Sequence, residues 1–266
     1  MGKSKQNRQI TAGVLLFLII FFADLILQRM PPEHLREFSM ERLLQTSLLP
    51  VGQTMYIWGG GWSEDDAVAG IEAVTLGVSK QWAEYAARQT KLYDFDKTRY
   101  QNHDGLDCSG YIGWLLYNVF HTRNGETGYV VGASEMARAC AMRGWGYLIR
   151  NDYRPGDICS MEGHVWMSLG RCMDGSVLLV HASPPGVRIC GTYLADGTKS
   201  QAVMLAERVM KRKYPVWYAR YPECGVGHFY LEDSVSMRWY TDETTDPYHL
   251  QEMHAESIVH FLYPDL

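Results

Sequence analysis

Cys108 is the residue in this sequence best placed to act as a nucleophile. It stands in the run Asp107-Cys108-Ser109-Gly110, after a polar, glycine-containing stretch and before a densely apolar run that continues to Phe120. This pattern predicts a loop that delivers the cysteine to the first turn of a buried helix, with Asp107 or Ser109 as the N-cap. Because the positive end of a helix dipole favours a thiolate, we expect the pKa of this thiol to be lowered. The alternative is a small buried cysteine that packs as an apolar residue.

Two histidines could supply a base and the group that orients it. His164 opens one predicted strand and His181 closes the next, with Met173-Asp174-Gly175-Ser176 between them as a hairpin signal. A two-residue turn places His181 opposite Ser168. Alternate residues of a strand share a face, so both histidines are then predicted on the same side of the sheet. That register leaves them four strand positions apart, whereas a longer loop that shifts it by two or four residues brings them together.

Together these residues could perform covalent catalysis. The chemistry needs a thiolate, an imidazole that holds and donates its proton, and a third polar group that orients the imidazole. Cys108, His164 and His181 supply these in chain order, with the nucleophile on a helix and the base on a sheet packed against it. This is a papain-like arrangement. His103 lies close to Cys108 in the sequence, but we interpret it as a solvated loop residue.

Five short motifs follow one another in a fixed order over roughly residues 50–221. They are Tyr56-Ile57-Trp58-Gly59-Gly60, Asp107-Cys108-Ser109-Gly110, Pro155-Gly156-Asp157, His164-Val165 and His181-Ala182. In type and order they resemble the motifs of the NlpC family of cell-wall endopeptidases, which are papain-like cysteine peptidases. The resemblance implies that Cys108 is the nucleophile, His164 the base and His181 its orienting partner.

The same resemblance implies a substrate and the residues that bind it. Tyr56 would line the site near the thiolate, and Asp107 and Ser109 would help to recognise the amino end of a substrate peptide. The backbone N–H of Cys108, at the helix start, is a natural oxyanion donor. The implied activity is hydrolysis of peptidoglycan stem peptides near a γ-D-glutamyl to diamino-acid bond, with no cofactor.

The chain departs from the family pattern in its spacing. About 46 residues separate the glycine pair from the Asp-Cys motif, where the family usually has a short link. This insertion, at about 61–103, could cap the cleft and narrow the substrate range. The hairpin between the two histidines is also longer than expected, and the tail over 223–266 lies outside the resemblance.

Two other functions fit the same residues. One keeps the fold and the thiol but changes the reaction to that of an amidase or acyltransferase acting on another surface substrate. The other is a non-catalytic module that binds wall peptides or a partner, which the intact triad argues against. Metal catalysis fits poorly, because His249 and His254 are five residues apart and form no HExxH pattern. We therefore predict no metal site.

The N-terminus predicts a membrane anchor. Basic residues precede an apolar run over 10–27 that is interrupted only by Asp24 and is just long enough to cross a bilayer. A cleaved signal peptide is the alternative, but no small-x-small cleavage site follows the run. The charge distribution places the N-terminus in the cytoplasm. We predict an uncleaved, single-pass signal-anchor in the cell membrane, with everything from about residue 30 outside the cytoplasm.

Composition is consistent with this interpretation. A chain of 266 residues, 47% of them hydrophobic, can bury one sizeable core. A net charge of -5 and no basic stripe give no reason to expect nucleic acid as a partner. The six cysteines form no CxxC pair. Some of them could pair in an exported protein, but their spacing does not say which.

Periodicity and turn signals predict an α+β fold, with helices first and an antiparallel sheet afterwards. The predicted domains are a cytoplasmic tip and membrane helix over 1–29, a linker helix over 30–49, a peptidase-like domain over 50–222 and a C-terminal extension over 223–266. The predicted helices cover 33–48, 63–90 (as two helices broken near Gly77), 109–120, 134–142 and 199–212. The predicted strands cover 157–161, 164–171, 176–182, 187–191 and 215–221.

Overall fold

The computed structural model describes residues 38–100, 103–124 and 127–266. The predicted membrane segment over 10–27 and the first part of the helix predicted over 33–48 lie outside these residues. Within the described ranges, no helix combines the length and apolar character needed to span a bilayer.

The described residues form helices and strands, with five consecutive strands, β3 to β7, in the middle of the chain. The helices are α2 (Met40–Leu48), α3 (Lys80–Arg88), α4 (Cys108–Asn124), α5 (Met136–Met142), α6 (Gln201–Lys213), α7 (Pro215–Arg220), α8 (Phe229–Glu232) and α9 (Ala255–Leu262), with short 3-10 turns at Phe95–Lys97, Ala133–Glu135 and Leu250–Glu252. The strands are β1 (Met55–Tyr56), β2 (Gly105–Leu106), β3 (Gly146–Ile149), β4 (Ile158–Met161), β5 (His164–Arg171), β6 (Val177–Ser183), β7 (Gly186–Thr192), β8 (Gly225–Val226) and β9 (Val235–Trp239).

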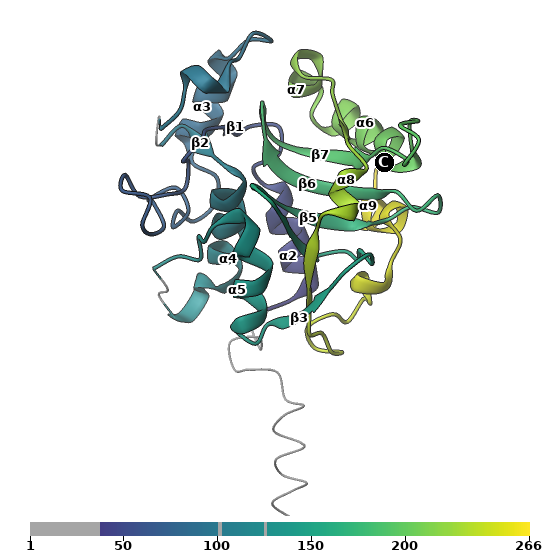
Figure 1. Cartoon of the computed structure of the whole chain (residues 1–266). Helices are drawn as coiled ribbons and strands as arrows, with labels where there is room; N and C mark the ends of the chain where they lie inside the picture. The colour runs from purple at the N-terminus through teal and green to yellow at the C-terminus, as the bar shows by residue number, and fades with distance from the viewer. Residues whose placement is uncertain (1–37, 101–102, 125–126) are drawn as a thin grey trace, which may run out of the picture.

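These strands form one mixed, curled sheet that resembles half of a barrel (Figure 1). Its order is β2-β1-β7-β6-β5-β4-β9-β3, with β8 paired to β7. The pairs β1–β2 and β7–β8 are parallel, and the other pairs are antiparallel. The α+β class predicted from the sequence is confirmed, and the sheet is mixed rather than purely antiparallel.

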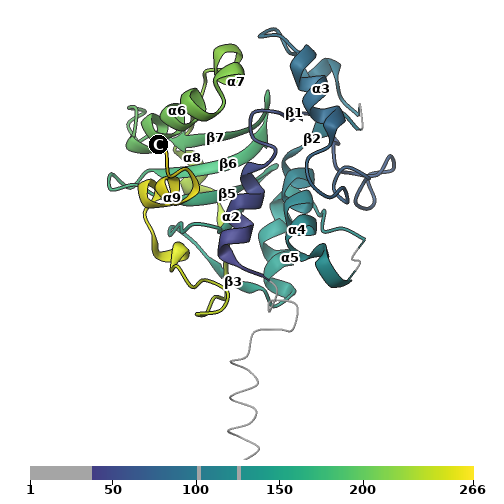
Figure 2. The same cartoon turned by 180° about the vertical axis from the view of Figure 1, so that it is seen from behind.

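The two faces of the sheet are covered differently. Leu178 and Val180 of β6 pack into the main core with the helices, whereas Val177 and Leu179 pack into a smaller core on the other face. Because successive side chains of a strand point to opposite faces, one strand contributes to both cores. Figure 2 shows α2 and α9 in front of the sheet, and Figure 1 shows α8 on the opposite side. The smaller core is closed by residues of α8, including Tyr230.

Most of the predicted hairpin region is confirmed. β4 to β7 lie within one or two residues of the four strands predicted over 157–191, and α6 lies within two residues of the helix predicted over 199–212. Ser200 is the N-cap of α6, because its side chain accepts the N–H of Val203. Three basic residues in the last turn of α6 complement the helix dipole.

The prediction of helices over 63–90 is wrong in its first half, where residues 63–79 form turns and α3 begins only at Lys80. The Ser63 hydroxyl accepts the backbone N–H groups of Ala67 and Val68, which closes a loop instead of capping a helix. Asp66 adopts a positive φ of 54°, a conformation that an α-helix does not contain.

The strand predicted over 215–221 is also wrong, because α7 forms there. Pro215 occupies the start of this helix, where its missing N–H costs nothing. Trp217 and Tyr221 lie four residues apart and their rings meet at 5.0 Å, which is a helical neighbour relation rather than a strand alternation. Arg220 donates to the carbonyl oxygen of Ala86, so α7 docks against α3.

Residues 223–266, predicted as a C-terminal extension, contribute to the same sheet and core. β9 lies between β4 and β3, and α9 packs against β5. Arg238 of β9 pairs with the buried Asp157 carboxylate at 2.7 Å, and the Trp239 indole donates to the carbonyl of Gly156. The Pro-Gly-Asp motif is therefore held by the part of the chain that follows residue 222.

Candidate active site

Cys108 is the first residue of α4, as the sequence predicted. Asp107 is the N-cap, because its carboxylate accepts the Gly110 N–H at 2.7 Å and the Ser109 hydroxyl at 2.8 Å. The second carboxylate oxygen accepts the N–H of Gly59 at 3.2 Å. One side chain therefore starts the helix that carries the thiol and ties that helix to the Tyr-x-Trp-Gly-Gly loop.

Glycines allow this loop to lie directly on the helix start. A Cβ added to Gly110 would lie 2.0 Å from the carbonyl oxygen of Gly60, and one added to Gly61 would lie 2.5 Å from the Cα of Gly110. No side chain fits at such distances. The Asp107 N–H also donates to the Gly60 carbonyl at 2.9 Å. The glycine run thus serves close approach to another segment.

The thiol opens into a pocket of about 250 Å³. Its lining combines the nucleophile with all three residues predicted to bind substrate, and consists of Tyr56, Trp58, Gly59, Trp62, Asp66, Asp107, Cys108, Ser109, Ala133 and Gly163. Residues from two of the five motifs, and from the insertion, therefore meet around one thiol, whereas His164 and His181 are not among the lining residues.

His164 and His181 meet on the same face of the sheet. The His164 Nε2 and His181 Nδ1 atoms are 3.0 Å apart, a hydrogen-bond distance. The pairing of β5 with β6 continues to place His181 across from Trp166, two positions from His164. Diagonal neighbours at this spacing can touch through long side chains. The predicted shared face is correct. The separation of four strand positions, predicted for a two-residue turn, is wrong, because the two histidines are only two positions apart.

Two local features change the register by two residues. The hairpin loop has three residues, 173–175, because the Cys172 N–H donates to the Ser176 carbonyl at 2.8 Å. Gly175 takes the positive φ that such a loop requires. A β-bulge between Ser168 and Gly170 adds the second residue of the shift.

The open end of this hairpin faces the thiol. The ladder pairing of β5 with β6 ends at the pair Met167–Val180. Beyond it, the backbone N–H of Val165 approaches the Cys108 thiol closely enough to act on its pKa. Among the described residues, however, the Cys108 sulfur makes no direct hydrogen bond to His164. Catalytic hydrogen bonds are often long in the absence of substrate and shorten in the substrate complex.

The protonation states differ from the sequence prediction. Burial, and then the charge of Asp107, raises the pKa of the Cys108 thiol to about 12, although the N–H groups of Val165 and Ser109 act to lower it. The prediction of a lowered pKa for Cys108 is therefore wrong, because the loss of hydration on burial outweighs the stabilisation of the thiolate by the N-terminal end of the helix. Burial, followed by the charge of Arg188, lowers the pKa of His164 to about 4. At neutral pH the thiol and the imidazole are both uncharged.

Arg188 and Tyr230 surround the histidine pair and were missed in the sequence. Arg188 pairs with His181 across β6 and β7, and its guanidinium donates to the carbonyls of Ser183 and Pro184 at 2.6 and 2.7 Å. Arg188 could have been found from the sequence, because it is a charged residue in the middle of an otherwise apolar predicted strand. Tyr230 lies in α8, in the tail, where no motif marked it. Its ring contacts both imidazoles.

The insertion supports Tyr56 and the rim of the pocket. The Tyr93 hydroxyl donates to the Tyr56 carbonyl at 2.5 Å, and the Phe95 ring packs edge-on against the Tyr56 ring at 5.7 Å. The Arg99 guanidinium lies 5.4 Å from the ring centre of the half-exposed Trp58. Described residues of the insertion therefore line the pocket, at Trp62 and Asp66, and pack against two of its other lining residues.

Asp107 and Ser109 are occupied by bonds within the protein. Ser109 accepts the Trp62 indole N–H at 2.9 Å while it donates to Asp107. Burial raises the pKa of Asp107 to about 6, although its hydrogen bonds with Gly110 and Ser109 act in the opposite direction. Both residues line the pocket, but their side chains are already hydrogen-bonded within the protein. Their role in recognising the amino end of a substrate peptide stays a prediction.

His103 takes a different role from the triad. Its ring pairs with the buried carboxylate of Glu72 at 3.1 Å, and its backbone N–H donates to the same side chain. The ring remains more than half exposed. This pair closes the insertion on itself, so His103 is a loop residue as predicted, with a structural partner.

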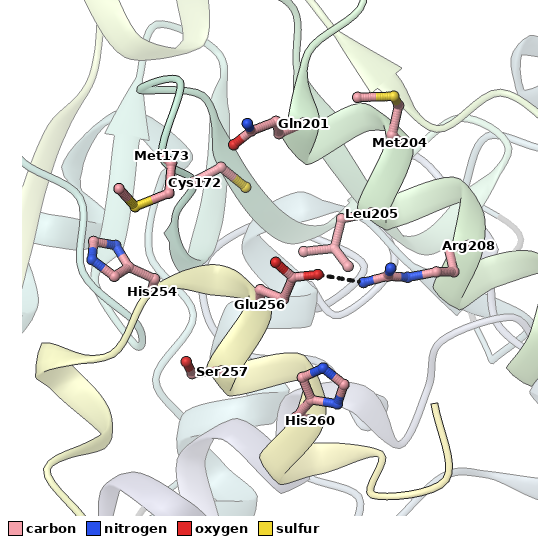
Figure 3. A pocket seen from close by; sticks show the side chains of 10 residues that line it. All are labelled: Cys172, Met173, Gln201, Met204, Leu205, Arg208, His254, Glu256, Ser257 and His260. Atoms are coloured by element: carbon pink, nitrogen blue, oxygen red, sulfur yellow. Dashed lines mark hydrogen bonds and ion pairs between the residues drawn. The ribbon is translucent and has the colours of Figure 1, made fainter.

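A larger pocket, of about 670 Å³, lies between the β5–β6 turn, α6 and α9 (Figure 3). It is lined by Cys172, Met173, Gln201, Met204, Leu205, Arg208, His254, Glu256, Ser257 and His260. Arg208 and Glu256 point toward each other and form an ion pair of 2.9 Å. Within the described ranges, no group of three or more His, Cys, Asp or Glu residues is arranged to hold a metal ion.

Comparison with known proteins adds no relative: no family model, no curated protein and no solved structure matches this chain.

Proposed function

We propose that this chain is a papain-like cysteine peptidase with Cys108 as nucleophile, His164 as base and His181 as the residue that orients the base. The observation that carries the proposal is the 3.0 Å contact between His164 Nε2 and His181 Nδ1. This contact involves the Nε2 atom of His164, so the Nδ1 atom of the same ring remains available to accept the thiol proton of Cys108. The closeness of the neighbouring Val165 N–H to Cys108 supports the same assignment.

The tautomer follows from the chemistry. If the His164 Nε2–H donates to His181 Nδ1, then His164 Nδ1 carries a lone pair that can accept the thiol proton. Both groups are neutral at rest, so the proton moves as the sulfur attacks rather than beforehand. Exclusion of water by the bound substrate and the approach of its carbonyl would make this transfer favourable.

The reaction then proceeds in two halves. The Cys108 sulfur forms a bond to the carbonyl carbon while its proton passes to His164, and the Cys108 N–H at the start of α4 stabilises the oxyanion. His164 protonates the leaving amine as the C–N bond breaks. In the second half, water gives a proton to His164 and attacks the thioester, and the returning proton restores the thiol.

The substrate class rests on the resemblance of the five motifs to those of NlpC endopeptidases. We propose peptidoglycan stem peptides as substrates, cleaved near the γ-D-glutamyl to diamino-acid bond. A catalytic domain held outside the cytoplasm by the apolar segment over 10–27 would meet this substrate. The narrow pocket and the insertion residues that line it favour an extended peptide over a bulky one.

The test is the release of fragments from purified peptidoglycan by the full-length protein in detergent, followed by mass spectrometry. We expect Cys108→Ala to abolish release and Cys172→Ala, a mostly buried cysteine in the other pocket, to preserve it. The masses of the fragments identify the bond cleaved and separate a peptidase from an amidase or acyltransferase. Equal release by wild type and Cys108→Ala would refute the proposal.

A non-catalytic wall-binding module is the second candidate. Its support is the protonated state of Cys108 and the absence, among the described residues, of a hydrogen bond from its sulfur to His164. This candidate predicts that the wild type sediments with insoluble peptidoglycan without releasing fragments, and that Cys108→Ala sediments equally well.

A further inference from the structure

Tyr230 links the C-terminal part of the chain to the histidine pair. It lies in α8, and only 8% of its surface is exposed. Its ring centre is 5.5 Å from that of His164 and 5.9 Å from that of His181, with interplanar angles of 65° and 68°. On another side it contacts Trp166 at 6.0 Å. One aromatic ring therefore touches both imidazoles and is itself held by the sheet.

This packing restricts the imidazoles. The two histidine rings are inclined at 76° to each other, and Tyr230 lies edge-to-face or tilted against each. Rotation of the His164 ring, which would exchange its nitrogens and break the 3.0 Å bond to His181, requires space that the Tyr230 ring fills.

The ring, rather than the hydroxyl, makes these contacts. The Tyr230 hydroxyl has no hydrogen-bond partner among the described residues, and burial raises its pKa well above the usual value. A ring that contacts both imidazoles is well placed to set the orientation of the His164 ring.

We propose that Tyr230 is a positioning residue, whose ring holds the His164–His181 pair in the orientation needed to accept the Cys108 proton and keeps water away from it. This inference rests on the proposed function. It extends the candidate site beyond the five motifs, into a region of the chain that the family resemblance does not cover.

The proposal has a consequence for protonation. The titratable and charged groups around His164 are Cys108 on α4, His181 on β6, Arg188 on β7 and Tyr230 on α8. Burial is the largest cause of the low pKa of His164, which is about 4. Replacing the Tyr230 ring by a smaller side chain admits water, so the pKa of His164 rises toward its usual value of about 6.5. The base must be neutral to accept the thiol proton. As the pH is lowered, the variant therefore loses activity at a higher pH than the wild type does.

The experiment compares Tyr230→Leu, which removes the ring, with Tyr230→Phe, which keeps it, in the full-length protein. For Tyr230→Leu we expect kcat for fragment release to fall at least about tenfold, a part of the ~10²–10⁴-fold that a positioned acid–base group contributes. We expect KM to stay within about twofold and the acidic limb of kcat/KM to move to higher pH. Tyr230→Phe should match the wild type in all three. Glu232→Ala, at an exposed position of the same helix, controls for damage to α8.

A second readout does not depend on peptidase activity. In protein labelled with ¹³C at histidine and assigned with His164→Ala, NMR titration should give a His164 pKa near 4 in wild type and Tyr230→Phe, and a raised value in Tyr230→Leu. Equal losses in Tyr230→Phe and Tyr230→Leu would assign the effect to the hydroxyl and overturn the proposal. An unmoved His164 pKa in Tyr230→Leu would also overturn it. A wild type that releases no fragments refutes the proposed function, while the titration still tests Tyr230.

Discussion

Two pockets formed by the described residues each contain a mostly buried cysteine, and their contrast shows what makes a thiol a candidate nucleophile. Cys108 and Cys172 are 6% and 8% exposed. The pocket at Cys172 is the larger one and has two histidines in its lining. Size and composition alone would therefore favour the pocket at Cys172 over the proposed site at Cys108.

The difference lies in how the polar groups are connected. At Cys172, Arg208 and Glu256 neutralise each other, and among the described residues neither His254 nor His260 is hydrogen-bonded to another imidazole. Cys108 is the first residue of α4, and the hydrogen-bonded imidazoles of His164 and His181 lie on the sheet, at the end of the β5–β6 hairpin that is nearest to this thiol. A relay of groups that can pass a proton, rather than the volume of a cavity, distinguishes the two regions.

The largest expected effect separates the histidines of the two pockets. His164→Ala should lower kcat/KM for fragment release by about 10²–10⁴-fold, because it removes the base. His254→Ala should leave kcat/KM within about twofold, as expected of an exposed position away from the site. Release rates measured by mass spectrometry test both. Comparable losses of kcat/KM in the two variants would contradict the assignment of the reaction to the pocket at Cys108.

Ion pairs offer a second contrast, measured as stability. Arg238→Met leaves the fully buried Asp157 carboxylate without its partner and should cost about 3–5 kcal/mol of unfolding free energy. Arg208→Met breaks a pair whose side chains are 45% and 65% exposed and should cost at most about 1 kcal/mol. Urea denaturation followed by circular dichroism measures both. A small loss in Arg238→Met would mean that the Pro-Gly-Asp motif does not depend on β9.

The pH dependence of alkylation compares the two thiols directly. Burial raises the pKa of Cys172 to about 11 and that of Cys108 to about 12, so both are protonated at pH 7. Below these values the thiolate fraction grows about tenfold per pH unit at either cysteine. Iodoacetamide labelling, located by peptide mass spectrometry, should therefore rise steadily with pH at both positions. A plateau for Cys108 below pH 8 would instead indicate a preformed thiolate–imidazolium pair.

The smallest expected effect concerns two serines. Ser109→Ala removes the acceptor of the Trp62 indole and one donor to Asp107, and should cost about 1 kcal/mol. Ser257→Ala, at an exposed position of the larger pocket, should change stability by less than about 0.5 kcal/mol. Thermal unfolding of the two variants checks this. A larger loss in Ser257→Ala would reveal a structural role for that pocket.

Elements built by local rules were predictable. Asp107 caps α4 through atoms within three residues of itself, so the helix start at Cys108 could be read from a short run of sequence. The strands β4 to β7 follow from alternation and from a glycine in the turn. The shared face of His164 and His181 follows from parity alone, and it was correct.

Elements that depend on distant segments were not predictable. Residues 63–79 contain a good helix-start signal, yet the Ser63 hydroxyl and the buried Glu72 carboxylate bind backbone groups of a closed loop. The aromatic residues of 215–221 suggested a strand, but docking on α3 favours a helix. In both cases tertiary hydrogen bonds outweigh a local preference of less than about 1 kcal/mol per residue.

The sequence by itself determined which residues could form a triad, where the nucleophile begins its helix and which face the histidines share. These properties arise from hydrogen bonds and alternation over a few residues. The tertiary structure decided the contact between the imidazoles, through a bulge and a loop longer by one residue. It also decided the raised pKa of Cys108 and the place of Tyr230, because burial sums over segments that are far apart in the chain.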